Sequence, residues 1–122
     1  MKYMISIYSN PKPWAHPTFM HREGLSDADR EARMAQFGAL MQEISESGEL
    51  VTGQPLADPA EARTVRAVNG ELTTVDGPFH TTEEQLVGYF VVECESIDRA
   101  VEIASRFPDA HDGATEVRAF ME

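Results

Sequence analysis

The side chains that could carry out proton transfer lie in one short segment. Asp76 follows a run of strand-forming residues and leads into a Gly-Pro turn, and His80 comes four residues later. A carboxylate can act as a general base or orient an imidazole, and an imidazole donates and accepts protons near neutral pH. If the turn folds back, Asp76 and His80 would form an acid–base dyad. The structural alternatives are an Asx turn at Asp76, which is compatible with catalysis, and an exposed loop position for His80.

Candidate substrate-binding residues lie on either side of this segment. Trp14 and His16 belong to a proline-rich stretch, 10–24, which is long for a loop. We expect them to wall a mostly apolar pocket, with Phe79 as a further contact. The alternative is a plain packing role or a contact between subunits.

Arg118 is the residue that we expect to anchor an anionic substrate. Its planar guanidinium can form paired hydrogen bonds with a carboxylate or a similar group. It alternates with Glu116 on the last predicted strand, so both side chains face the same side. An ion pair between them, or across a dimer, is the structural alternative.

The sequence lacks the motifs of metal and cofactor enzymes. His16 and His21 do not have a recognised ligand spacing. There is no Gly-rich phosphate loop, Cys-x-x-Cys pair, Gly-x-Ser-x-Gly elbow or His-Glu-x-x-His helix. Cys94 is the single cysteine, which excludes an internal disulfide, and we interpret it as a small buried residue. We therefore expect no metal and no cofactor.

Length and charge limit the class of protein. The 122 residues fit one domain, 1–122. The net charge of −11 repels nucleic-acid phosphates and anionic membrane surfaces, so we expect neither as a partner. No apolar run approaches the roughly 20 residues of a membrane-spanning helix, and the strand-like residues 1–8 do not resemble a signal peptide. We therefore expect a cytoplasmic protein.

Apolar periodicity predicts the elements that would position these residues. Residues 2–8 and 86–92 are apolar on both faces, which predicts two central strands. Ser26 and Ser96 are good N-caps for two helices, the second ending at Pro108. We expect the following residues to form the buried stripes: Met34, Phe37, Leu40, Met41 and Ile44 in the first helix, and Ile97, Ala100, Val101 and Ala104 in the second.

A β-hairpin is predicted in the middle of the chain. The β-rich runs 64–69 and 71–75 meet at Asn69 and Gly70, which tolerate the positive φ angles of a type I′ turn. The sequence leaves open whether the first of these runs, or the run 50–54, supplies the second core strand.

The order of the elements predicts the fold class. After the second helix we expect a loop at 109–113 and a last strand at 115–121. The whole pattern fits an α+β, ferredoxin-like βαββαβ sandwich with an extra hairpin. Gly88, within the second central strand, predicts a close approach by another backbone.

Two motifs resemble the signature of the YCII-related, or DGPF-domain, family. The first is Val75-Asp76-Gly77-Pro78-Phe79 followed by residues 84–90. The second covers residues 107–113 and continues into Glu116-Val117-Arg118. Residues 1–4 and the Asn-Gly turn also fit, so the resemblance covers nearly the whole chain. It implies a homodimer in which two such sheets face each other as a dimeric α+β barrel.

The resemblance also implies functions. Related YCII proteins have been proposed to act through a His and an Asp in a cleft, and some relatives catalyse dehydrochlorination or isomerisation. Other DGPF domains occur beside sigma-factor genes or are fused to sigma factors. After the first motif the family usually has Ala-Glu-Thr-Lys-Glu, where this chain has residues 80–84, and Ala119 replaces a usual proline. A function that depends on the missing Glu and Lys is not expected here.

These observations lead to two hypotheses. The first is a cofactor-free acid–base enzyme of the lyase, dehydrochlorinase or isomerase type, in which Asp76 and a nearby histidine move a proton on a small organic substrate. The second is a non-catalytic module that binds a small ligand or a protein partner, with a link to sigma-factor regulation. A cofactor-free oxygenase has only fold analogy in its favour.

Overall fold

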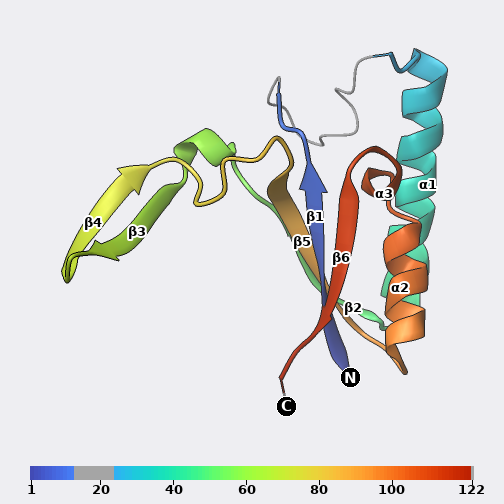
Figure 1. Cartoon of the computed structure of the whole chain (residues 1–122). Coiled ribbons are helices and arrows are strands. Elements are labelled where there is room, and N and C mark those ends of the chain that lie inside the picture. Colours follow the sequence, from blue (N-terminus) through green and yellow to red (C-terminus); the bar gives the residue numbers. More distant parts are fainter. Residues whose placement is uncertain (13–23, 122) are drawn as a thin grey trace.

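The computed structural model describes residues 1–12 and 24–121. Figure 1 shows the arrangement of the elements. The strands are β1 (Lys2–Ser9), β2 (Leu50–Pro55), β3 (Arg63–Val68), β4 (Glu71–Asp76), β5 (Gln85–Glu93) and β6 (Ala114–Ala119). The helices are α1 (Asp27–Glu46), α2 (Ile97–Ser105) and the short α3 (Asp109–Asp112), with a 3₁₀ turn, η2, at Pro59–Glu61.

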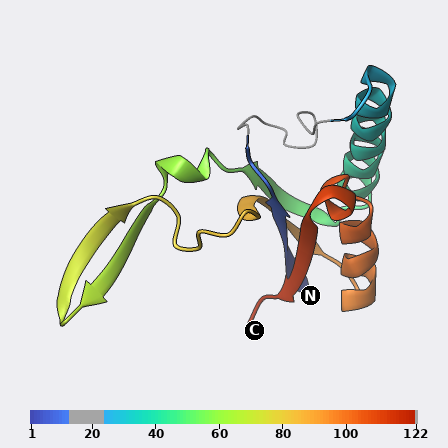
Figure 2. The same ribbon diagram turned by 45° about the horizontal axis from the view of Figure 1, so that its top comes forward.

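Four strands form an antiparallel sheet in the order β2-β5-β1-β6. The helices α1 and α2 cover one face of this sheet, and no helix in the described part of the chain covers the other (Figures 1 and 2). The α+β class, the central positions of β1 and β5 and the extra hairpin are confirmed. The second core strand is β2, so the run that begins at residue 50 supplies it and β3 belongs to the hairpin.

The core lies between the sheet and the helices. Tyr3, Ile5 and Ile7 alternate along β1 and are buried, because side chains two apart share one face of a strand. An aromatic cluster joins the two layers: the ring centroid of Phe90 lies 4.8 Å from that of Phe107 and 6.2 Å from that of Phe37. The other buried residues packed here are Leu40, Ile44, Val87, Val92, Cys94, Ala100, Ile103 and Ala104.

Several local predictions are confirmed. Asn69 and Gly70 have φ angles of 52° and 82°, as a type I′ turn requires. A Cβ at Gly88 would lie 3.2 Å from the carbonyl oxygen of Gln54, so the strands do approach closely there. Ser26 caps α1 and completes a capping box with Asp29, and these hydrogen bonds lower the pKa of Asp29.

Other details of the helices differ from the predictions. Met34 is 51% exposed rather than buried, because the first half of α1 extends beyond the sheet (Figure 1). On α2, Ile97 and Val101 are exposed, and Ile103 is buried in their place. On α2, apolar residues lie on both sides of the predicted buried stripe. The periodicity therefore did not define which surface of this helix contacts the sheet.

The predicted loop at 109–113 contains the helical turn α3. Pro108 precedes this turn with φ of −54°, and the fixed φ of proline suits the start of a helix as well as the end of one. Gly113 ends the turn, with its N–H donating to the carbonyl of Asp109 at 2.8 Å.

An ionic network ties the helices to the start of β2. The guanidinium of Arg99 on α2 donates two hydrogen bonds of 2.8 Å to Glu49 and one of 3.2 Å to Glu43 on α1. The bonds from Arg99 lower the pKa of Glu49 to about 2.

No helix in the described residues is both long and apolar enough to cross a membrane.

Candidate functional site

The strands β3 and β4 form a separate two-stranded ladder, here called the hairpin arm. It projects from the edge of the main sheet on the side away from the helices (Figures 1 and 2). Arg63 pairs with Asp76 in this ladder, and Arg66 pairs with Thr73. Because neighbouring side chains on a strand point to opposite faces, Arg63 and Asp76 share one face of the arm and Arg66 lies on the other.

Asp76 lies at the base of the hairpin arm, as the last residue of β4. Its carboxylate pairs with the guanidinium of Arg63, and its side chain is 84% exposed. The next residue, Gly77, is bound twice: its N–H donates to Ala62 at 2.6 Å, and its carbonyl accepts from the Thr64 hydroxyl at 2.9 Å. Among the described residues, the Asp76 carboxylate forms no hydrogen bond with its own turn or with His80.

His80 instead lies in an aromatic contact. Its ring centroid is 4.8 Å from that of Phe79, in an edge-on arrangement. The guanidinium carbon of Arg66 lies 5.1 Å from the centroid of the same Phe79 ring. The Gln85 side-chain amide donates to the carbonyl oxygens of His80 and Thr82, at 2.6 and 2.7 Å, and so fixes the loop. We call this set the Arg66–Phe79–His80 stack.

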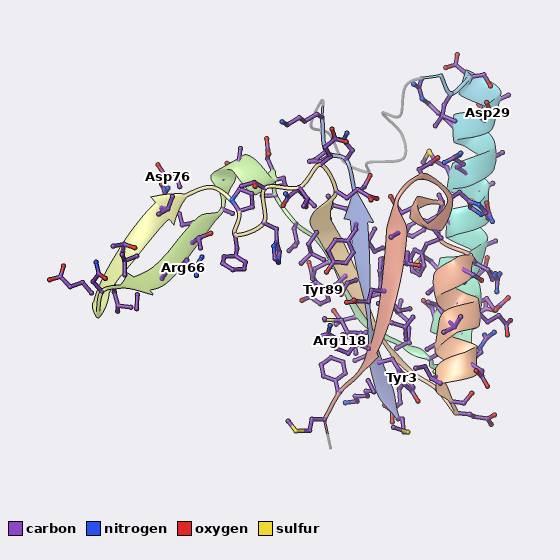
Figure 3. All side chains as sticks on the ribbon, viewed as in Figure 1. Tyr3, Asp29, Arg66, Asp76, Tyr89 and Arg118 are labelled. Atoms are coloured by element: carbon purple, nitrogen blue, oxygen red, sulfur yellow. The ribbon has the colours of Figure 1, made fainter. Side chains whose placement is uncertain are left out.

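The stack lines an open cleft of about 1090 Å³ between the hairpin arm and the main sheet. Tyr8 and Leu86 line it from the sheet, and η2 borders it. Phe79 is 59% exposed, so its ring is accessible to a ligand. Asp76 is not among the lining residues, and Figure 3 shows it on the side of the arm opposite Arg66.

Arg118 lies elsewhere. It stands opposite Met4 in the β1–β6 ladder and points, like Tyr89, away from the helices (Figure 3). Its guanidinium lies 3.7 Å from the Glu116 carboxylate, which is the predicted ion pair, and its side chain is 73% exposed. The structure therefore does not bring Arg118 into the cleft with His80.

Two further candidates, Trp14 and His16, lie outside the described residues. Cys94 is buried, and burial raises the pKa of its thiol, as expected of a packing residue.

Sequence reasoning missed Arg66, Tyr8 and Leu86. All three lie in strands that were predicted. The strand pattern does not say which face of the hairpin turns toward the sheet, so Arg66 carried no signal of its own. Tyr8 and Leu86 are cross-strand partners at the end of the β1–β5 ladder, and their pairing follows an irregularity that the pattern does not specify.

Comparison with known proteins places the chain in a family. It belongs to the YCII-related domain family, whose model matches residues 1–122. The resemblance noted in the sequence is thus confirmed. A relative is the uncharacterised protein R00369 of Rhizobium meliloti (strain 1021), 34% identical over 95 residues, or 76% of this chain and 77% of the relative.

A solved structure is also similar over most of the chain. It is 5-chloro-2-hydroxyhydroquinone dehydrochlorinase (TftG) from Burkholderia phenoliruptrix AC1100, in complex with 2,5-dihydroxybenzoquinone. The identity is 13% and the TM-score 0.44, with 99% of this chain and 94% of that chain covered.

Proposed function

We propose that this protein is a cofactor-free acid–base enzyme that acts on a small organic substrate, with His80 as the proton-transfer group. One observation carries the proposal: His80 and the exposed Phe79 ring line the same open cleft, opposite Tyr8 and Leu86 of the sheet. A concave site with apolar walls and a few polar groups is the usual form of a small-molecule site. Asp76 takes a supporting role, because its ion pair with Arg63 joins the two strands at the base of the arm and Arg63 lines the cleft.

The chemistry proposed is elimination or isomerisation. Neutral imidazole of His80 would accept a proton from a substrate carbon, and the C–H electron pair would form a double bond. In an elimination the leaving group departs from the neighbouring carbon with its bonding electrons. In an isomerisation the imidazolium returns the proton at a different carbon.

The test is a pair of variants assayed on a panel of small molecules with an acidic C–H beside a leaving group. His80→Gln is expected to lower turnover by about 100-fold, the usual contribution of a general base. Asp76→Asn should lower it by less than tenfold, since the carboxylate faces away from the cleft. Unchanged turnover in His80→Gln would refute the catalytic role of His80. A large loss in Asp76→Asn alone would indicate that Asp76 is the catalytic residue instead.

A second function is favoured by one observation. No carboxylate of the described residues orients the His80 imidazole, because Asp76 pairs with Arg63 instead. A non-catalytic site for a small ligand needs no such orientation. Saturable binding in the cleft without turnover of any compound would support this alternative.

We also propose that the protein is a homodimer formed through the helix-free face of the main sheet. Met4 and Tyr89 lie on this face and are partly exposed, and a second copy would cover them. Sedimentation velocity is expected to show a dimer. Tyr89→Glu should weaken it by at least about 30-fold, because buried aromatic residues dominate interfaces. Leu72→Glu, on the exposed tip of the arm, is the control and should leave the dimer intact. A monomeric wild-type protein would refute the proposal.

A further inference from the structure

Arg66 differs from the other arginines in its partners. Its guanidinium donates no hydrogen bond to the described residues and lies over the face of the Phe79 ring. The chain carries a net charge of −11, so carboxylates are plentiful. All of the other arginines in the described ranges pair with one: Arg30, Arg33, Arg63, Arg99, Arg106 and Arg118.

The position of Arg66 makes it suitable for binding an anion. A guanidinium stacked on an aromatic ring keeps its N–H donors at its edge, where they can form paired hydrogen bonds with a carboxylate. Arg66 shares the cleft with Phe79, His80 and Leu86. A ligand could thus place an apolar body against Phe79 and Leu86 while its charged group meets Arg66.

The acidic residues of the cleft limit the charge of such a ligand. Asp58, Glu61 and Glu84 line the same space. The Asp58 carboxylate accepts a hydrogen bond of 2.9 Å from the N–H of Ala60 and so stays at the mouth of η2. Repulsion from these carboxylates opposes phosphates and other multiply charged groups.

We infer that the cleft selects small organic monocarboxylates with an apolar body, through the guanidinium of Arg66. The inference rests on the proposed function and names its substrate class. It assigns the role of anion anchor to Arg66 in place of Arg118, which does not line the cleft.

Titration of the protein with benzoate and with benzamide, followed by NMR, tests this inference. Benzamide has the same shape as benzoate and no charge. Benzoate is expected to shift the amide signals of Phe79 and His80 in a saturable way, and to bind at least about tenfold more tightly than benzamide. The preference should shrink at high ionic strength, because exposed charges are screened. Phthalate, a dianion of similar size, should bind more weakly than benzoate.

Matched arginine variants complete the test. Arg66→Gln should abolish the preference for benzoate, whereas Arg106→Gln, at the end of α2 on the helix side of the main sheet, should retain it. Equal binding of the two compounds to the wild type, or an unchanged preference in Arg66→Gln, would overturn the role of Arg66 while leaving a ligand site in the cleft. If neither compound shifts the cleft signals, the anion site is refuted. His80→Gln should lose turnover and keep the benzoate preference, so failure of catalysis and failure of anion binding are distinguishable.

Discussion

Replacing Phe107 by alanine is expected to lower the free energy of unfolding by about 3–5 kcal/mol. The Phe107 side chain is fully buried, at 0% exposure, and its ring lies against those of Phe37 and Phe90. The truncation removes the transfer free energy of the ring and leaves a cavity that helices on one side and a sheet on the other cannot close. Domains of this size have total stabilities of about 5–15 kcal/mol, so this loss is a large share of the total free energy of unfolding.

Urea denaturation followed by circular dichroism measures this effect. Phe79→Ala is the matched control, because it removes the same atoms from an exposed ring in the cleft. It should cost less than about 1 kcal/mol, in the range of surface substitutions. Similar losses in the two variants would contradict the assignment of the aromatic cluster as the centre of the core.

Gly113→Ala is expected to cost about 2–3 kcal/mol, at the upper end of overpacking effects. A Cβ at this position would overlap the carbonyl oxygen of Tyr8 and would lie 3.2 Å from the Cα of Ser9. Both atoms belong to the backbone, so no side-chain rotation relieves the overlap, and the start of β6 must move away from the end of β1. Since Tyr8 also lines the cleft, the displacement should reach the proposed site.

Gly38→Ala is the control for this substitution. Gly38 is exposed within α1, and an added Cβ would meet no atom within 4 Å. Alanine is the better helix former, so this variant should gain up to about 1 kcal/mol. Thermal unfolding of the two variants should therefore shift in opposite directions. A Gly113→Ala protein as stable as the wild type would show that the β1–β6 contact is looser than the structure indicates.

Local chemistry made most of the fold predictable from the sequence. Ser26 identified the start of α1 because its hydroxyl satisfies a free backbone N–H, and Asn69 with Gly70 identified the hairpin because both adopt positive φ. These signals depend on a few neighbouring atoms and need no tertiary context. The burial of Ile103 in place of Val101 was not predictable in this way, because it depends on how α2 lies on the sheet.

The site was less predictable than the fold. Asp76 and His80 are four residues apart in the sequence. The distance between their side chains depends on the direction in which Asp76 points at the end of β4 and on the path of the turn that follows. The pairing of Arg63 with Asp76 extends the register of the Asn69-Gly70 hairpin by one pair beyond the predicted runs, 64–69 and 71–75. The contact between Arg66 and Phe79 spans 13 positions of sequence. Phe79 and His80, which the sequence offered as candidate site residues, both line the cleft; their roles in it stay predictions.

The separation of the hairpin arm from the main sheet has a consequence for how this protein can change over evolutionary time. The arm supplies Arg66 to the cleft, whereas the aromatic cluster around Phe107 lies on the far side of the main sheet, among the helices. Substitutions in the arm can alter the shape and charge of the cleft without opening the core. Substitutions among the twelve residues of β3 and β4 can therefore change the substrate during evolution, while the main sheet and the helices keep their fold.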